Sequence, residues 1–310
     1  MTTTAMAAGR AAPAPGRRSL GAILEPWTYV GPAVVLIALV MVLPLVVGLS
    51  YAFQQAHILN KSQLNWVGLQ NFRTLFADRV FWLALGNTFY WTFASLALQF
   101  GFGLALALLL NRPFYGKRVI QAIVFVPWAV PTFLSGLTWA WLFNPIVGPI
   151  PHWLFDLGLM DEPYNILGDP RFAMLGPIVA NVWFGVPFFA ITLLAALQSI
   201  PDELYEAAAI DGAGAWQQFV MITLPFLAPM IAVTVLLRTI WISNFADLIV
   251  VMTNGGPANT TQILPSYIFT VAYRKLDFGY ASAVATALLL LLMLYAGILY
   301  RLRQSLRRTT

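Results

Sequence analysis

The sequence predicts an all-α, polytopic membrane protein with six transmembrane helices and a further helical segment between the fourth and the fifth. The 310 residues are 60% hydrophobic and 9% charged, whereas soluble domains carry roughly 25% charged residues. Six apolar segments reach the roughly 20 residues that a transmembrane helix needs. A polar segment, residues 200–225, separates two of them. The length therefore fits one membrane domain without a separate soluble domain of ordinary size.

Residues 1–28 precede the first apolar segment and are rich in Ala, Pro, Gly and Thr. Because this composition is too poor in core-forming residues to fold, we expect a disordered cytoplasmic tail. Residues 29–300 form the predicted membrane domain, and residues 301–310 form a basic cytoplasmic tail. The six predicted spans are residues 29–53, 82–110, 119–143, 173–198, 226–249 and 280–300.

The placement of Lys and Arg predicts that both termini are cytoplasmic. An even number of spans returns both ends of the chain to one side. Ten basic residues lie on the side of the termini: three in the N-terminal tail, three in the turn at residues 111–118 and four in the C-terminal tail. The loops on the opposite side carry six in all. Because basic loops stay in the cytoplasm, residues 200–225 also face the cytoplasm, although they contain no Lys or Arg.

Prolines inside the spans, such as Pro127 and Pro131 in the third, are expected to kink their helices. They indicate either packing irregularity alone or a bundle around a cavity that moves. The proline-rich outer loop at residues 144–172 is either a stiff connector or a docking surface. In the loop that follows the fifth span, four aromatic residues suit the aromatic belt at the membrane interface, Tyr267, Phe269, Tyr273 and Tyr280.

The segment 200–225 is predicted to form a helix, a turn and a second helix. Pro201 is placed to begin the first helix, with two carboxylates in its first turn, where the helix dipole favours anions. Gly212 and Gly214 permit a break before a second short helix that Pro225 delimits. Apolar residues on such short helices usually mark a protein contact. Packing on the cytoplasmic ends of the chain's own helices is the alternative.

The same segment resembles the EAA signature of the membrane-spanning subunits of binding-protein-dependent ABC importers. Glu206-Ala207-Ala208 is followed by three residues, Gly212, nine residues, Ile222, one residue and Leu224-Pro225. The resemblance implies a coupling helix that seats in a groove of a cytoplasmic ATPase subunit and transmits its closure. The residues to which it assigns this role are Glu206, Ala207, Ala208, Asp211, Gly212, Ile222, Leu224 and Pro225.

Other segments resemble the carbohydrate branch of that family, the permeases of maltose-like and glycerol-phosphate-like systems. They are residues 181–188, 197–201, 243–245, 248–249, 253–257 and 278–283. The resemblance implies a multi-pass protein of the bacterial inner membrane that transports a carbohydrate. It also implies a second permease subunit in a heterodimer, two ATPase subunits and an extracytoplasmic substrate-binding protein. ATP and Mg would then bind to the ATPase partner, and this chain would need no cofactor.

Helical geometry indicates a substrate path on two of the spans. At 100° per residue, four residues of the fourth span share one face, with Trp183 roughly opposite, and four residues of the fifth span share another. A sugar offers hydroxyls to amide and guanidinium groups and C–H faces to aromatic rings. Asn181 and Gly185 are equally consistent with helix packing. The candidate substrate-binding residues are Asn181, Phe184, Gly185, Phe188, Arg238, Trp241, Asn244 and Phe245.

Four polar residues inside the spans call for partners. Arg238 costs roughly 2.5–3.5 kcal/mol at mid-bilayer and must face a cavity or a partner. In an unbroken helix, Asp247 would lie half a turn round and roughly 13.5 Å along the axis from Arg238, too far for the two side chains to pair. Asp247 is therefore a gate, a substrate acceptor or an interfacial group. Asn87 and Gln99 are expected to form interhelical hydrogen bonds.

Enzyme chemistry finds no support in the sequence. His57 and His152 stand alone without metal-ligand spacing, so no catalytic or metal-binding residue is predicted. The net charge of +5 reflects orientation in the membrane and not nucleic-acid binding, because no basic stripe with interleaved aromatic residues occurs. An autonomous secondary transporter or channel is the alternative function, and a membrane-embedded enzyme ranks third.

Overall fold

The computed structural model describes residues 20–57 and 65–308, and the chain divides into a unit that ends at Ser50 and a second that begins at Tyr51. Trp27–Tyr51 in the first helical stretch is long and apolar enough to cross a membrane. Residues 1–19 lie outside the described residues. The first helix begins at Leu20, so the prediction of a disordered tail is wrong for residues 20–28. This stretch comprises α1 (Leu20–Ile37), the π-helical turn η1 (Ala38–Val42) and α2 (Leu43–Tyr51).

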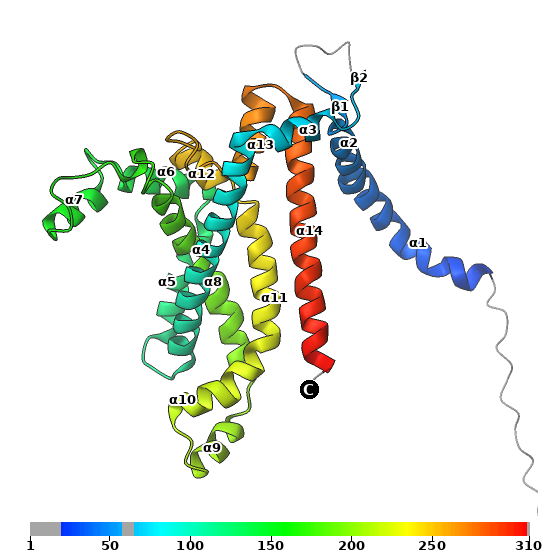
Figure 1. Ribbon diagram of the computed structural model, residues 1–310. Coiled ribbons are helices and arrows are strands. Elements are labelled where there is room, and N and C mark those ends of the chain that lie inside the picture. The colour runs from blue at the N-terminus through cyan, green and yellow to red at the C-terminus, as the bar shows by residue number, and fades with distance from the viewer. Residues whose placement is uncertain (1–19, 58–64, 309–310) are drawn as a thin grey trace, which may run out of the picture. The chain divides into compact units, whose positions relative to one another are not determined.

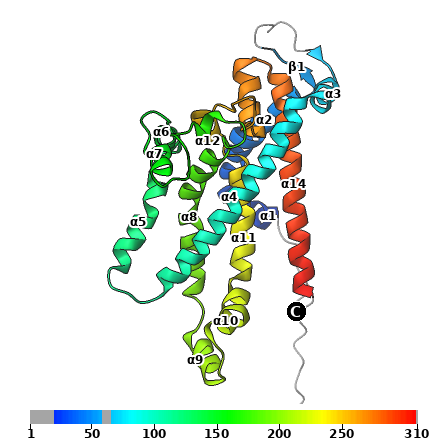
Figure 2. The same ribbon diagram turned by 60° about the vertical axis from the view of Figure 1, so that its left-hand side comes forward.

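Four long helices dominate the second unit, and α4, α8 and α11 pack side by side (Figures 1 and 2). They account for most of four predicted spans, although α11 ends before the fifth span does, and the last helix continues through most of the predicted basic tail. The described part of the chain holds five helices that could cross a membrane, or six if one bent pair is a single span. The four helices are α4 (Arg79–Asn111), α8 (Leu175–Leu197), α11 (Leu224–Ser243) and α14 (Phe278–Arg308).

The predicted third span, residues 119–143, is a bent pair of helices and not one helix. α5 (Lys117–Ala129) and α6 (Thr132–Leu142) meet at an angle of 95°. Val130 between them is extended, with φ −84° and ψ 125°, because a residue that precedes proline disfavours the helical region. Pro131 therefore breaks the span, whereas Pro127 stays inside α5.

The predicted fifth span is interrupted as well. α11 ends at Ser243, and α12 (Asp247–Met252) begins after three non-helical residues. α12 packs against α6, so the two short helices that follow the breaks are neighbours. Gly136 permits this approach because it has no side chain. A Cβ there would lie only 3.0 Å from Val251 Cβ, closer than two carbon atoms normally approach.

Short elements connect the long helices. Two-residue strands form an antiparallel pair in which Gln54 lies opposite Trp66, a small departure from the predicted all-α fold. The elements are β1 (Gln54–Gln55), β2 (Asn65–Trp66), α3 (Gln70–Ala77), α7 (Pro149–Asp156), η3 (Ile166–Gly168), α13 (Leu264–Phe269) and the π-helical turn η5 (Thr270–Arg274).

The pKa of the Asp169 carboxyl in the outer loop lies well below its usual range. The cause is the Arg171 guanidinium, 2.8 Å away, together with a hydrogen bond from Tyr164.

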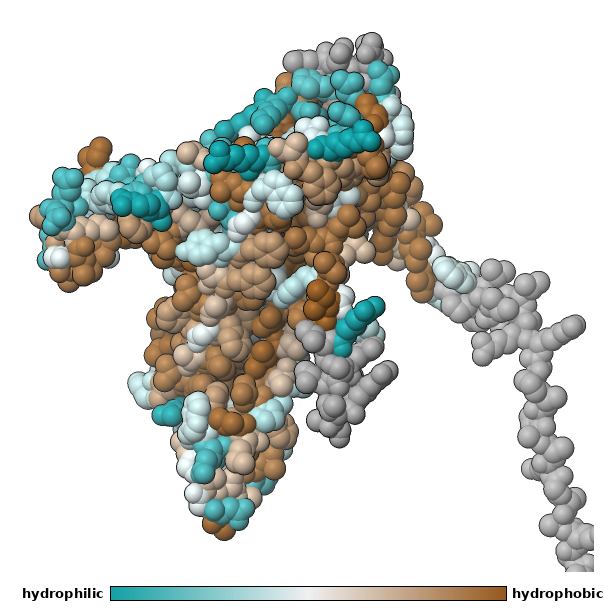
Figure 3. All heavy atoms as spheres, viewed as in Figure 1, coloured by the Kyte–Doolittle hydropathy of each residue, from teal (hydrophilic) through white to brown (hydrophobic). Residues whose placement is uncertain are grey.

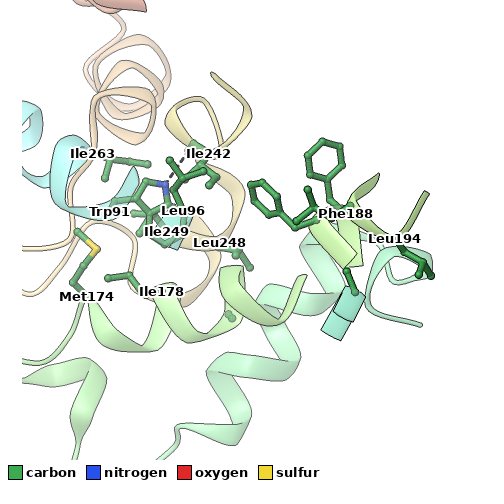
Figure 4. Close-up of a cluster of buried hydrophobic side chains, with 14 of the residues drawn as sticks. Trp91, Leu96, Met174, Ile178, Phe188, Leu194, Ile242, Leu248, Ile249 and Ile263 are labelled. Atoms are coloured by element: carbon green, nitrogen blue, oxygen red, sulfur yellow. Dashed lines mark hydrogen bonds between the residues drawn. The ribbon is translucent and has the colours of Figure 1, made fainter. Parts of the chain in front are cut away.

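Large apolar side chains from α4, α8, α11 and α12 form the main buried cluster (Figure 4). Its largest member, Trp91, is fully buried and donates its Nε1–H to the carbonyl of Ile242 at 2.9 Å. This bond fixes α4 against α11. On the outside, apolar residues cover the middle of the second unit, while hydrophilic residues gather mainly toward its two ends (Figure 3). That distribution is typical of helices that cross a bilayer.

Asp78 joins the starts of α4, α13 and α14. It caps α4 by accepting from the Val80 N–H at 2.8 Å, and it also accepts from Tyr267 at 2.5 Å and Tyr280 at 2.6 Å. Burial favours the neutral acid, but these hydrogen bonds together outweigh it and hold the pKa of Asp78 below its ordinary value. Both tyrosines are buried. The prediction that they form an aromatic belt is therefore wrong for this pair.

Replacing Asp78 with alanine is expected to destabilise the protein by at least the roughly 1 kcal/mol that a lost helix cap costs. Because the folded-state pKa is lowered, the carboxylate stabilises the fold above the unfolded pKa of about 3.9, and this stabilisation disappears as pH falls through the folded value. Thermal unfolding at neutral pH should separate wild type from Asp78→Ala, and the gap should narrow below about pH 4. An unchanged gap at acid pH would contradict the role of the ionised carboxylate.

Candidate functional site

α8 and α11 enclose a cavity of about 290 Å³ beside the break between α11 and α12. Six of the eight residues proposed from helical periodicity lie in its wall, so the two predicted faces do meet. Gly185 and Phe188 do not line it and instead pack behind the wall. The lining residues are Asn181, Phe184, Arg238, Ile240, Trp241, Ile242, Asn244 and Phe245.

A hydrogen-bonded chain of polar groups links α4, α8 and α11 behind the cavity. Arg238, only 4% exposed, donates its Nε–H to Gln99 Oε1 at 2.7 Å. Gln99, fully buried, donates in turn to the backbone carbonyl of Asn181 at 3.0 Å. The interhelical hydrogen bond expected of Gln99 is confirmed. That expected of Asn87 is wrong, because Asn87 donates to the carbonyls of Asn259 and Gln262, which lie in the loop between α12 and α13. Arg238 thus has both a partner and a cavity.

Gly185 makes this polar chain possible. A Cβ at residue 185 would lie 2.1 Å from the Gln99 side chain and 2.4 Å from Arg238 Nη2. Only glycine leaves room for the two side chains to meet, so Gly185 acts in helix packing rather than as part of the cavity wall. Asn181 differs, because its side-chain oxygen and nitrogen are both buried and have no hydrogen-bond partner.

Aromatic rings form much of the remaining wall. Phe184 and Phe245 stack at 5.5 Å with 20° between their planes, which joins α8 to the break after α11. Trp241 meets the buried Phe188 edge-on at 5.3 Å. Trp183 packs instead against Trp139 of α6 at 6.0 Å, in keeping with its predicted position on the opposite face of α8.

Asp247 does not contact Arg238 and lies at the start of α12. Its Oδ2 accepts from Thr132 Oγ1, the first residue of α6, at 2.9 Å. The hydrogen bond ties the break in the third predicted span to the break in the fifth. The sequence did not suggest this pairing, because the two residues are 115 positions apart and both breaks had to be known first.

The segment 200–225 begins as predicted but continues differently. α9 (Asp202–Ile210) ends at a turn where Gly212 adopts φ +81°, a value that favours glycine. α10 (Ala215–Gln218) then runs through the π-helical turn η4 (Phe219–Thr223) directly into α11. Pro225 lies inside this continuous helix, directly after the π-helical turn, in which the Leu224 N–H bonds back to the carbonyl of Phe219. The prediction that Pro225 delimits a separate second helix is therefore wrong.

Part of this segment packs on its own chain, and part is free. Tyr205 hydrogen-bonds Thr223 at 2.9 Å, and Ile222 packs against the main buried cluster. By contrast, Ile210 is 86% exposed and Trp216 is 74% exposed. The carboxylates of Asp202, Glu203, Glu206 and Asp211 are also exposed. An acidic, partly apolar surface thus projects at the end of the second unit opposite α7 (Figure 1).

Broken membrane helices around a cavity that carries hydrogen-bonding groups beside aromatic rings are features of a membrane transport component. A family described as "Binding-protein-dependent transport system inner membrane component" matches residues 99–308, and the chain belongs to this family. The resemblance to permease subunits of binding-protein-dependent ABC importers is thereby confirmed. The protein is a multi-pass inner-membrane subunit of a transport system and not an enzyme.

Individual relatives agree with this family. The trehalose/maltose transport system permease protein MalF of Thermococcus litoralis is 40% identical over 71% of this chain and 74% of that protein. The sulfoquinovosyl glycerol transport system permease protein SmoG of Agrobacterium fabrum is 33% identical over 87% of each chain. A crystal structure of a bacterial ABC transporter that imports the acidic polysaccharide alginate has a TM-score of 0.77 at 25% identity and covers 92% of this chain and 99% of that chain.

Proposed function

We propose that this subunit forms half of the translocation path of an ATP-driven importer for a carbohydrate that a substrate-binding protein delivers. The cavity between α8 and α11 carries the proposal. A sugar needs hydrogen-bonding groups for its hydroxyls and aromatic rings for its C–H faces. Asn181, Asn244 and Arg238 supply the first, and Trp241 and Phe245 supply the second.

The relatives support the substrate class and leave its charge open. Trehalose and maltose are neutral saccharides, whereas alginate is acidic, and the proteins named for them all resemble this chain. A carbohydrate is the class that they share. The features of the cavity that would distinguish one carbohydrate from another must then be sought in this chain's own residues.

In the proposed arrangement, α5 and α6 together make one span, which brings the number of spans to six. Both termini and α9 lie in the cytoplasm, and α7 lies on the outer side. The segment 200–225 serves as the coupling loop, with α9 as its docking helix. The exposed surface of α9 supports this role, since acidic and apolar groups without partners in the described chain suit a protein groove.

The proposed complex contains a second permease subunit in a heterodimer, two ATPase subunits and an extracytoplasmic binding protein. ATP and Mg bind to the ATPase subunits, and this chain carries no cofactor. Closure of the ATPase subunits pushes α9, and the helices that are broken near Pro131 and Asn244 rock so that the cavity opens outward. The Thr132–Asp247 hydrogen bond would make the two broken helices move together.

Replacing Trp241 with alanine is expected to raise the substrate concentration for half-maximal uptake about two- to tenfold, because a stacked ring contributes about 0.5–1.5 kcal/mol. Trp183→Ala is the matched control, since it removes the same ring from the opposite face of α8. Both variants are to be compared in uptake of labelled saccharide by liposomes that contain the whole complex. Equal effects of the two substitutions would contradict the assignment of the cavity.

A further inference from the structure

The cavity contains a positive charge that no acidic group neutralises. Arg238 is 4% exposed, and arginine stays protonated at physiological pH. Among residues 27–57 and 65–301, whose side chains the structure describes, the salt bridge between Arg171 and Asp169 is the sole ion pair, so Arg238 has none with these residues. The cavity wall contains no Asp or Glu, and the nearby Asp247 already accepts from Thr132.

The protein satisfies this guanidinium only in part. Gln99 accepts from Nε, but the hydrogen bonds of the described chain include none from the two terminal nitrogens. The rings of Phe184 and Phe188 lie 6.0 Å and 5.9 Å from the guanidinium carbon. Such contacts contribute about 0.5–2 kcal/mol, less than the cost of keeping an unpaired charge inside the membrane.

A second polar group in the wall also lacks a partner. Asn181 is fully buried, and neither its Oδ1 nor its Nδ2 forms a hydrogen bond in the described structure. Buried polar groups are normally paired, and an unpaired amide costs about 1–3 kcal/mol. One wall therefore offers a guanidinium whose terminal nitrogens have no hydrogen-bond partner and an amide without a partner, next to the exposed ring of Trp241.

We propose that the transported saccharide carries a negative charge, a carboxylate or a sulfonate, which pairs with the terminal nitrogens of Arg238. The inference rests on the proposed function. A planar guanidinium fits such oxyanions with two parallel hydrogen bonds. The amide of Asn181 then binds a ring hydroxyl, and Trp241 stacks on the sugar. Gln99 is a positioning residue: it accepts from Nε and leaves the two terminal nitrogens without a hydrogen-bond partner in the described chain.

The test uses matched saccharide pairs that differ only in charge. Sulfoquinovosyl glycerol is compared with glucosyl glycerol, and a mannuronate disaccharide with mannobiose. Binding is measured by titration of the purified permease–ATPase complex in nanodiscs without the binding protein, so that the selectivity of that protein does not enter. In the wild type, the acidic member of at least one pair should bind about 10- to 100-fold more tightly than its neutral partner.

Two substitutions separate the charge from the fold. Arg238→Gln removes the charge, whereas Gln99→Glu keeps Arg238 in place and neutralises it with a carboxylate at the same site. In both variants, the ratio of the affinity for the acidic saccharide to the affinity for its neutral partner should fall close to one. The midpoint of thermal unfolding is measured for each variant, so that a lost preference is not mistaken for a lost fold. Gln99→Glu keeps a buried acceptor for Nε but loses the donor to the Asn181 carbonyl, so its midpoint should fall modestly while the protein still unfolds in one transition. Arg238→Lys should retain part of the preference, since it keeps the charge but loses the planar geometry.

Equal binding of acidic and neutral members by the wild type overturns the inference and leaves the proposed function intact. A preference that survives in Arg238→Gln has the same consequence. Binding of none of the four saccharides at millimolar concentration contradicts the carbohydrate assignment as well as the charge.

Discussion

Replacing Gly103 with alanine is expected to lower the midpoint of thermal unfolding by about 5 °C, because overpacking a close contact costs about 1–3 kcal/mol. Gly103 lies where α4 crosses α8. A Cβ there would lie 2.4 Å from Phe189 Cβ and 3.2 Å from both the Ala190 nitrogen and the Val186 carbonyl oxygen. Two of these atoms belong to the backbone, so relief requires a shift of one helix, and leucine should prevent folding.

Gly101 provides a control in the same helix. A Cβ at residue 101 would have no neighbour within 4 Å, so Gly101→Ala should leave the midpoint unchanged or raise it slightly through better helix propensity. Both variants are to be purified in detergent and unfolded by heat under identical conditions. If Gly103→Ala is as stable as Gly101→Ala, the close crossing of α4 and α8 is not present in the protein.

Hydropathy predicted most of the helices because a span must be long and apolar whatever it packs against. It could not predict where helices break. Pro127 and Pro131 are both prolines within one apolar run, yet only the second ends a helix. Pro225 lies after a π-helical turn that lets the helix continue, and sequence pattern does not distinguish that geometry from a helix end.

Periodicity predicted the faces of α8 and α11 that meet at the cavity, since the helix repeat fixes which residues share a face. That these faces bind substrate stays a prediction. Periodicity was not sufficient to pair residues across helices. The partner of Arg238 is Gln99, 139 positions away on α4, and the roles of Gly103 and Gly185 depend on which side chains lie opposite them. Such contacts follow from helix packing and are not encoded locally.

Replacing Glu206 with lysine is expected to reduce ATP-driven saccharide uptake at least tenfold while leaving the fold unchanged. Glu206 is exposed on α9 and has no salt bridge within the described residues, so its reversal should cost the isolated subunit little stability. In the proposed complex this surface is buried against an ATPase subunit. Reversing a charge in such an interface leaves it beside the wrong partner, which typically costs 2 kcal/mol or more.

Glu162→Lys is the matched control. Glu162 is also exposed, and it lies in the predicted outer loop, which also contains α7, at the other end of the second unit (Figure 1). The same charge reversal there should leave ATP hydrolysis coupled to uptake, because in the proposed complex the ATPase subunits bind at the opposite end, around α9. A loss of coupling in both variants would indicate a general effect of net charge.

Parallel measurement of saccharide uptake and ATP hydrolysis in liposomes tests most directly whether this subunit works through an ATPase partner. The liposomes contain the complete complex with binding protein, or the same complex with Glu206→Lys, or this subunit alone under an ion gradient. We predict ATP-dependent uptake by the complete complex and no uptake by this subunit alone. The complex with Glu206→Lys should either hydrolyse ATP without matching uptake or show no stimulated hydrolysis. Uptake by this subunit alone, or normal coupling with Glu206→Lys, would contradict the proposed role of α9 and favour an autonomous transporter.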